Sequence, residues 1–187
     1  ALALGDNLFH GEELVLKLRN ANSRNEGATI FAYRVNDPKR YGIVEFNEEG
    51  LVINIEEKPK SPKSNFAVTG LYFYDNSVIN LAKSITPSKR GEYEITDLIN
   101  IYLKNNLLNV EVMGRGTAWL DTGTFESLHE ASSYVKTLEH QLGLLIGSPE
   151  EVAWRQNLIN DQQLKFLARK LNKSEYGKIL YRLVKDI

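Results

Sequence analysis

Two apolar segments of this chain each lead directly into an aspartate, and this repeated pattern limits the available folds more than any other feature. Residues 1–4 are small or aliphatic and lead through Gly5 to Asp6, and residues 118–120 lead to Asp121. An apolar run of this kind is typical of a buried parallel strand whose last residue projects beyond the sheet. Ligands of α/β folds bind at the carboxyl ends of such strands. The pattern therefore predicts an α/β fold with two carboxylates at one edge of a sheet.

The residues alone leave two interpretations of these aspartates open. Aspartate favours helix caps and turns, and each of the two comes shortly before a predicted helix. Two carboxylates at one sheet edge also suit Mg²⁺, which keeps several waters and takes one or two carboxylates together with substrate phosphates. Asp6 and Asp121 are thus candidates both for structural caps and for a metal site.

The sequence between the two aspartates alternates helical and strand patterns. Residues 41–46 and 51–56 alternate apolar and polar residues on either side of a turn, which predicts a β-hairpin that ends at Glu57 and Lys58. The remaining patterns predict, in this order, a helix at 11–25, strands at 29–35 and 66–74, a short helix through 81, a helix at 95–103, and short strands at 110–113 and 118–120.

The character of the chain changes after residue 146. Before this point, a helix is predicted from about Thr124, with Phe125 on its inward face. After it, Ser148 is followed by a proline and two glutamates, a strong signal for a helix start, and two further helical patterns follow. We therefore expect a mixed α/β domain at 1–146 and a C-terminal helical appendage at 147–187.

Composition argues against several classes of function. With 23 basic and 24 acidic residues the net charge is −1, so neither a nucleic-acid surface nor a basic membrane-binding face is indicated. The absence of cysteine excludes disulfides and thiolate catalysis and favours a reducing, cytoplasmic setting. No apolar run approaches the roughly 20 residues of a membrane span. Because the chain begins without Met inside a predicted strand, we expect it to be the C-terminal part of a longer protein.

Six short motifs occur along the chain in a fixed order: Leu4-Gly5-Asp6-Asn7, Tyr41-Gly42-Ile43-Val44-Glu45-Phe46, Glu56-Glu57-Lys58-Pro59, Val68-Thr69-Gly70-Leu71-Tyr72, Glu94-Ile95-Thr96-Asp97 and Trp119-Leu120-Asp121-Thr122-Gly123. With these motifs the chain resembles the sugar-1-phosphate nucleotidylyltransferases, and most closely the glucose-1-phosphate thymidylyltransferases among them. The resemblance covers essentially the whole chain, including the helical tail.

This resemblance implies a Rossmann-like nucleotidyltransferase sheet whose first strands, with a Gly-rich loop and a downstream Lys, are not part of the sequence. It implies that the complete enzyme uses Mg²⁺ and converts dTTP and glucose 1-phosphate into dTDP-glucose and pyrophosphate. The family further implies a cytoplasmic homotetramer that serves dTDP-rhamnose and polysaccharide biosynthesis. Without the loop, the chain is expected to bind sugar phosphate weakly and to be inactive alone.

The resemblance also implies roles for individual residues. Asp6 and Asp121 resemble the magnesium ligands, and Lys58 resembles the ammonium group that meets the sugar phosphate. Glu57 resembles the acceptor of hydrogen bonds from sugar hydroxyls. The other residues that resemble the lining of the sugar pocket are Tyr41, Gly42, Val68, Thr69, Gly70 and Trp119. A second, inhibitory nucleotide site near subunit contacts is suggested by Gly114, Arg115, Gly116, Glu151 and Arg155.

Purely structural roles for these residues, and other functions for the protein, stay open at this point. By their chemistry, Glu57 and Lys58 suit a polyhydroxylated phosphate ester, but they also fit an exposed ion pair at a hairpin end. The inhibitory-site residues also fit plain turn chemistry and ion pairs on a helix face. For the protein as a whole, the alternatives are a non-catalytic sugar-phosphate-binding or regulatory module, a uridylyltransferase of the same family, and a nucleotide-sugar glycosyltransferase.

Overall fold

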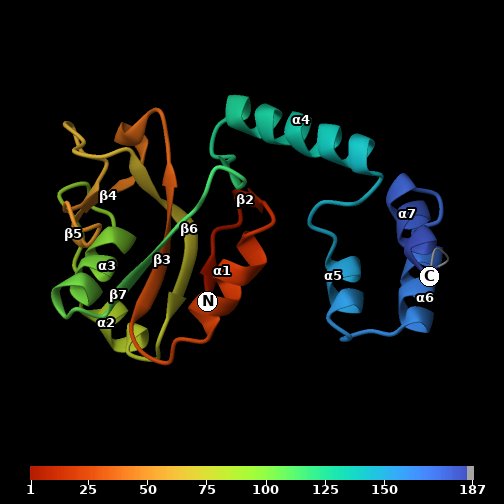
Figure 1. Ribbon diagram of the computed structural model, residues 1–187, viewed down its shortest axis with the longest axis horizontal. Coiled ribbons are helices and arrows are strands. Elements are labelled where there is room, and N and C mark those ends of the chain that lie inside the picture. Colours follow the sequence, from red (N-terminus) through yellow and green to blue (C-terminus); the bar gives the residue numbers. More distant parts are fainter. Residues whose placement is uncertain (185–187) are drawn as a thin grey trace. The chain divides into compact units, whose positions relative to one another are not determined.

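A computed structural model describes residues 1–184 and divides the chain into two compact units (Figure 1). The first unit comprises Ala1–Gly123, and the second begins at Thr124. This boundary lies upstream of the change in sequence character after residue 146, because the long helix that follows Thr124 groups with the second unit. The fold is mixed α/β, as the sequence predicts, with all of its described strands in the first unit.

A six-stranded sheet forms the centre of the first unit. Its strands follow the order β5-β4-β6-β3-β7, and β1 pairs with β6 outside this path. Only the β3–β7 pair is parallel, whereas all other pairs in this sheet are antiparallel. The strand bounds are β1 Leu2–Ala3, β3 Ala28–Arg34, β4 Gly42–Phe46, β5 Val52–Glu57, β6 Phe66–Tyr74 and β7 Leu108–Val112. The predicted hairpin is confirmed as β4 and β5, and the strand predicted at 66–74 is β6.

The opening segment differs from its prediction. Strand β1 runs antiparallel to β6, with Leu2 opposite Tyr72, and the side chains of Leu2 and Leu4 are each 42% exposed. The prediction of a buried parallel strand is therefore wrong for this segment. An apolar run indicates that a strand can be buried. The direction of the strand and the elements that pack on it depend on segments that are distant in the sequence.

Helices cover both faces of the sheet. The helix α3 (Ile95–Lys104) packs the fully buried Ile99 against Ile30 and Val44, and α2 (Val78–Ser84) lies beside it. On the other face α1 (Leu14–Asn22) buries Ala21 against Phe31. Figure 1 shows α1 on one side of the sheet and α2 and α3 on the other. This packing fixes the sheet that carries the site described below.

A short two-stranded ribbon completes the first unit. Strand β2 (Asn7–His10) pairs antiparallel with β8 (Ala118–Asp121), although more than a hundred residues of chain separate them. A single turn of 3₁₀ helix, η1 (Pro38–Arg40), leads into β4. The ribbon joins the two segments in which the sequence places an aspartate.

The second unit is helical. Its helices are α4 (Phe125–Leu142), α5 (Pro149–Arg155), α6 (Asp161–Lys170) and α7 (Glu175–Leu183). Ser148 and Ser174 cap α5 and α7 as predicted, since each side chain accepts a hydrogen bond from a backbone N–H three residues later. Leu164, Ala168 and Leu180 form its buried core. The long predicted helix is confirmed as α4.

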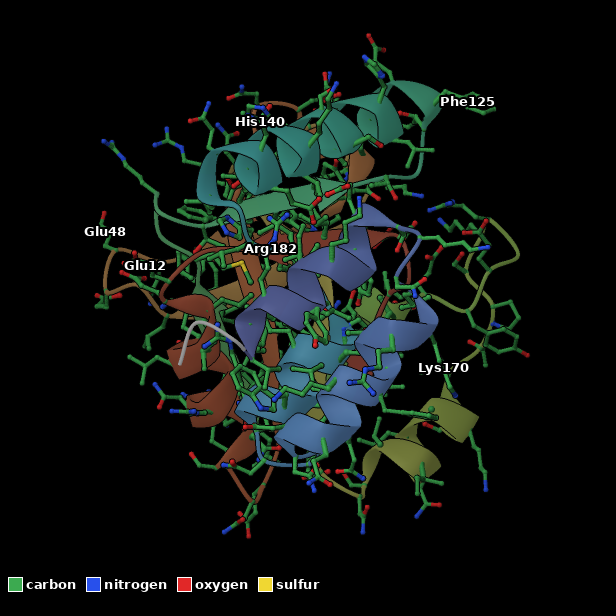
Figure 2. The ribbon with its side chains drawn as sticks, turned by 90° about the vertical axis from the view of Figure 1, so that its right-hand side faces the viewer. Glu12, Glu48, Phe125, His140, Lys170 and Arg182 are labelled. Carbon is green, nitrogen blue, oxygen red and sulfur yellow. The ribbon has the colours of Figure 1, made fainter. Side chains whose placement is uncertain are left out.

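One predicted feature of α4 is wrong. Phe125 was expected to face inward, but its side chain is 95% exposed, and Figure 2 shows it projecting from the start of the helix. Helical spacing predicts which residues share a face, but it does not supply a layer to cover that face. Among the described helices, none combines the length and the apolar character that a membrane span requires.

Candidate functional site

The β2–β8 ribbon brings Asp6 and Asp121 to the same end. Its register places Asn7 opposite Asp121, so Asp6, which directly precedes β2, lies beside the residue that ends β8. The backbone N–H and the Oγ1 of Thr122 each donate a hydrogen bond of 2.8 Å to the carbonyl oxygen of Asp6. The two aspartates meet because the start of one strand faces the end of the other. The sequence-based expectation of two parallel strand ends reached the correct pair through the wrong topology.

Gly123 shows how closely the two carboxylates converge. A Cβ atom at this position would lie 3.4 Å from Oδ1 of Asp121 and 4.0 Å from Oδ2 of Asp6. Oxygens of both carboxylates thus lie within ordinary contact distance of one point beside Gly123. Two convergent carboxylates are a donor set that fits Mg²⁺, which completes its shell with water and substrate phosphates. Within residues 1–184 no cluster of three or more metal-binding side chains occurs, so this pair is not a complete protein cage.

The capping interpretation of the two aspartates is not supported by the helix ends. The N-cap of α1 is Glu13, and the N-cap of α4 is Thr124, whose side chain and that of Ser127 form a capping box. Neither Asp6 nor Asp121 occupies a capping position. Both aspartates instead line a cleft.

This cleft has a volume of about 180 Å³ and lies where β1 and β4 meet the same edge of β6. Nine of the ten residues predicted for the metal site and the sugar pocket line this cleft. These nine are Asp6, Tyr41, Gly42, Glu57, Val68, Thr69, Gly70, Trp119 and Asp121. The hydroxyl of Thr69 is fully buried at the cleft and has no hydrogen-bond partner among the described residues. A buried polar atom without a partner is costly, which favours a site that receives a polar ligand.

Glu57 is held from two sides in the lining of the cleft. Thr96 donates a hydrogen bond of 2.5 Å to Oε2, and the Arg90 guanidinium lies 3.9 Å from Oε1. A Cβ at Gly42 would lie 3.1 Å from both that Oε2 and the Thr96 hydroxyl oxygen, so glycine leaves room for this contact. Burial, and after it the charge of Glu57, raises the pKa of Tyr72. The cleft lining therefore includes an oriented carboxylate acceptor.

Lys58 lies outside the cleft lining. It is exposed, its φ is 43°, and its backbone N–H donates to the carbonyl oxygen of Tyr41. Within the described part of the chain, no salt bridge links it to Glu57 or to another carboxylate. The predicted alternative of a Glu57–Lys58 ion pair is therefore not formed among the described residues.

Aromatic rings and a guanidinium border the aspartates. The ring centroids of Tyr41 and Trp119 are 5.1 Å apart, and the Arg40 guanidinium lies 5.5 Å from the Tyr41 centroid and 4.0 Å from Oδ2 of Asp121. Burial raises the pKa of Tyr41, Arg40 lowers it, and the Asp121 carboxylate raises it further. The Tyr41 phenol therefore stays neutral beside the carboxylate.

The residues predicted for an inhibitory site belong to two different units. Gly114, Arg115 and Gly116 form the turn between β7 and β8, where a Cβ at Gly114 would lie 3.3 Å from the Glu13 carboxylate. Glu151 and Arg155 form an ion pair of 2.8 Å one turn apart on α5. The remaining oxygen of Glu151 is buried without a partner among the described residues. Their joint role in one site stays a prediction.

Sequence reasoning assigned no role to four residues that shape the site. Each of them contacts a predicted site residue: Arg40 contacts Asp121, Arg90 and Thr96 contact Glu57, and Asn7 contacts Gly70. Asn7 and Thr96 stood within the quoted motifs, so a signal for them existed. Arg40 and Arg90 lie in turns whose sequence shows no link to the distant carboxylates that they contact.

The chain is similar to known nucleotidyltransferases. The chain is 52% identical to the glucose-1-phosphate thymidylyltransferase of Neisseria meningitidis and 55% identical to that of Mycolicibacterium smegmatis, in each case over 98% of this chain and 64% of the relative. Among solved structures, a Bacillus anthracis protein described as a glucose-1-phosphate thymidylyltransferase in complex with a sucrose is 42% identical, with a TM-score of 0.60 over 71% of this chain and 52% of that chain.

More distant structures share the fold. A UDP-glucose pyrophosphorylase solved with UDP-glucose is 23% identical with a TM-score of 0.59, covering 72% of this chain and 55% of that one. The chain spans about 64% of the length of the curated relatives given above. The family model described as nucleotidyl transferase matches residues 1–137, which include the whole cleft. The chain therefore belongs to the nucleotidyl transferase family.

Proposed function

We propose that the complete protein is a glucose-1-phosphate thymidylyltransferase. A phosphate oxygen of glucose 1-phosphate attacks the α-phosphorus of dTTP, the bond from that phosphorus to the bridging oxygen breaks, and dTDP-glucose and pyrophosphate leave. The observation that carries the proposal is the pair of carboxylates, Asp6 and Asp121, that converge at a cleft with an oriented acceptor, Glu57, in its lining. Relatives that carry this name are more than 50% identical over nearly the whole chain.

The donor set supports a magnesium site at the two carboxylates. Asp6 and Asp121 would hold the ion, which when bound neutralises charge on the phosphates and aligns them. No general base is needed, because the attacking phosphate is already anionic at neutral pH. The chain therefore contributes through positioning and electrostatic stabilisation.

The remaining residues divide between sugar and phosphate. Glu57, fixed by Thr96, accepts hydrogen bonds from sugar hydroxyls, and the Thr69 hydroxyl offers a further polar contact in the wall of the cleft. Val68 and Gly70 line the same wall on β6, and the Tyr41 and Trp119 rings supply an apolar surface against the sugar ring. The Lys58 ammonium, free of protein carboxylates in the described chain, provides a point charge for the sugar phosphate.

We infer the wider properties from the resemblance alone. They are a homotetrameric assembly, a cytoplasmic location, a role in dTDP-rhamnose and polysaccharide biosynthesis, and inhibition by a nucleotide. A preference for UTP has weaker support, since the structures named UDP-glucose pyrophosphorylase are 23% and 26% identical.

The test is pyrophosphate release by the product of the complete gene. With glucose 1-phosphate and Mg²⁺, we expect release from dTTP that exceeds release from UTP. The Asp121→Asn variant should lower kcat at least 100-fold while the thermal midpoint stays close to wild type, since it removes a charge that acts on the phosphates. The matched control is Asp161→Asn, which changes an aspartate of α6 whose contact with Trp154 an amide oxygen can also accept.

Two outcomes would reject the proposal. Release from UTP at a higher kcat/KM than from dTTP would assign the protein to the uridylyltransferases. Saturable binding of glucose 1-phosphate without any release from either nucleotide would favour a non-catalytic binding module.

A further inference from the structure

The carboxamide of Asn7 connects three parts of the site. Its Oδ1 accepts hydrogen bonds from the indole Nε1–H of Trp119 at 2.6 Å and from the backbone N–H of Gly70 at 3.0 Å. Its Nδ2 donates to Oδ1 of Asp6 at 2.9 Å. One half-buried side chain thus contacts β8, β6 and the aspartate that precedes β2.

The chemistry of the three partners fixes the orientation of this amide. The indole and the backbone amide are donors and require the amide oxygen, whereas the carboxylate is an acceptor and requires the amide nitrogen. A rotation by 180° about the last bond of the side chain would turn all three contacts into repulsions. Asn7 therefore holds Asp6 and Trp119 in a defined relation, which neither an apolar residue nor an aspartate could do.

Gly70 shows that the surroundings are shaped for this amide. A Cβ at position 70 would lie 2.6 Å from Oδ1 and 2.7 Å from Cγ of Asn7, closer than real contacts allow. Gly70 is buried in the middle of β6. The absence of a side chain there lets the Asn7 amide reach the β6 backbone.

We propose that Asn7 is a positioning residue that couples the metal-binding carboxylate to the sugar-facing wall. It orients Asp6 through Nδ2 and sets the Trp119 indole and the β6 edge through Oδ1. The Asn7 side chain would then set the distance between the metal site and the sugar pocket. The catalytic significance of Asn7 rests on the proposed function. The contacts of Asn7 and the two measurements that follow do not require an active enzyme.

The first measurement is Trp119 fluorescence in a Trp154→Phe background, in which Trp119 is the only tryptophan. Asn7→Ala removes the acceptor of the indole N–H and should shift the emission maximum. Asn7→Asp keeps an oxygen acceptor but sets a second negative charge against the Asp6 carboxylate, so it should also shift the emission. A merely structural contribution of Asn7 to stability would leave the emission of the folded variants unchanged.

The second measurement is binding of Mn²⁺ alone, followed by electron paramagnetic resonance. Loss of the hydrogen bond that orients a metal-binding carboxylate typically weakens metal affinity about tenfold or more, and we expect this for Asn7→Ala. Gly70→Ala should also weaken Mn²⁺ binding, because its Cβ would lie 2.6 Å from Oδ1 of Asn7 and 2.9 Å from the Cβ of Leu4, two residues before Asp6. Gly70→Ala also keeps the test decisive if Asn7→Ala fails to fold.

The matched control is Asn100→Ala. Asn100 lies in the same unit and donates its Nδ2 to the carbonyl oxygen of Ile55 at 2.9 Å, away from the aspartates. It should change neither Trp119 emission nor Mn²⁺ affinity. The proposal is overturned if Asn7→Ala behaves like Asn100→Ala in both measurements. A protein that releases no pyrophosphate but shows the expected Asn7 effects would refute the proposed function and leave this inference intact.

Discussion

Two threonines of the cleft offer a test of its hydrogen bonding, because the same substitution should have opposite effects at them. Thr96 is 3% exposed and donates to the Glu57 carboxylate, whereas Thr69 is fully buried and its hydroxyl has no partner among the described residues. Valine has nearly the shape of threonine but lacks the hydroxyl. Thr96→Val therefore removes one hydrogen bond, and Thr69→Val is the matched control that removes a hydroxyl without breaking a bond.

The expected free energies follow from these contacts. A hydrogen bond to a charged group contributes about 1.5–3 kcal/mol, and the extra buried methyl group of valine offsets somewhat less than about 1 kcal/mol. Thr96→Val should thus lower the free energy of unfolding by about 1–2 kcal/mol. Thr69→Val breaks no bond and removes an unpaired buried hydroxyl, so it should leave the free energy unchanged or raise it by up to about 1 kcal/mol.

The assay is urea unfolding in the Trp154→Phe background, in which Trp119 reports on the first unit alone. With a slope of about 1–3 kcal/mol per molar urea, Thr96→Val should lower the midpoint by about 0.3–2 M with the slope unchanged. Thr69→Val should lie at or above the background value. Equal losses for both variants would show that the Thr96–Glu57 contact contributes nothing specific, and the account of an oriented Glu57 would fail.

Three further perturbations test other parts of the molecule. Leu164→Ala should lower the free energy of unfolding of the second unit by about 2–5 kcal/mol, measured as faster amide hydrogen exchange in α6 and α7. Leu158→Ala, at a 76% exposed position, should change this free energy by less than about 0.5 kcal/mol. Similar effects of the two variants would contradict the assigned core. Lys58→Gln should weaken glucose 1-phosphate binding by about tenfold in calorimetry, and equal weakening by Lys60→Gln, an exposed residue of the same loop, would refute a specific role. Chelation by EDTA should abolish pyrophosphate release and Mg²⁺ should restore it, so turnover that persists after chelation would exclude the metal proposal.

Much of the fold could be predicted from local patterns. The β4–β5 hairpin, β6 and the caps at Ser148 and Ser174 lie where alternation and capping residues place them. These elements depend on contacts between residues that are close in sequence, and such contacts leave a readable signal. The exposed Phe125 and the antiparallel β1 were mispredicted because their surroundings come from distant segments or from layers that no local pattern specifies.

The candidate site shows the same division. The sequence by itself determined which residue types are available, that two apolar strands adjoin aspartates, and that the six motifs follow the order of a known family. Only the tertiary structure decided that these aspartates meet across an antiparallel ribbon, that Arg40 and Arg90 approach the carboxylates, and that Asn7 links Asp6, Gly70 and Trp119. The physical reason is that hydrogen bonds and ion pairs between residues up to 116 positions apart impose no periodicity on the chain, so they exist only once the sheet has brought their donors and acceptors within reach.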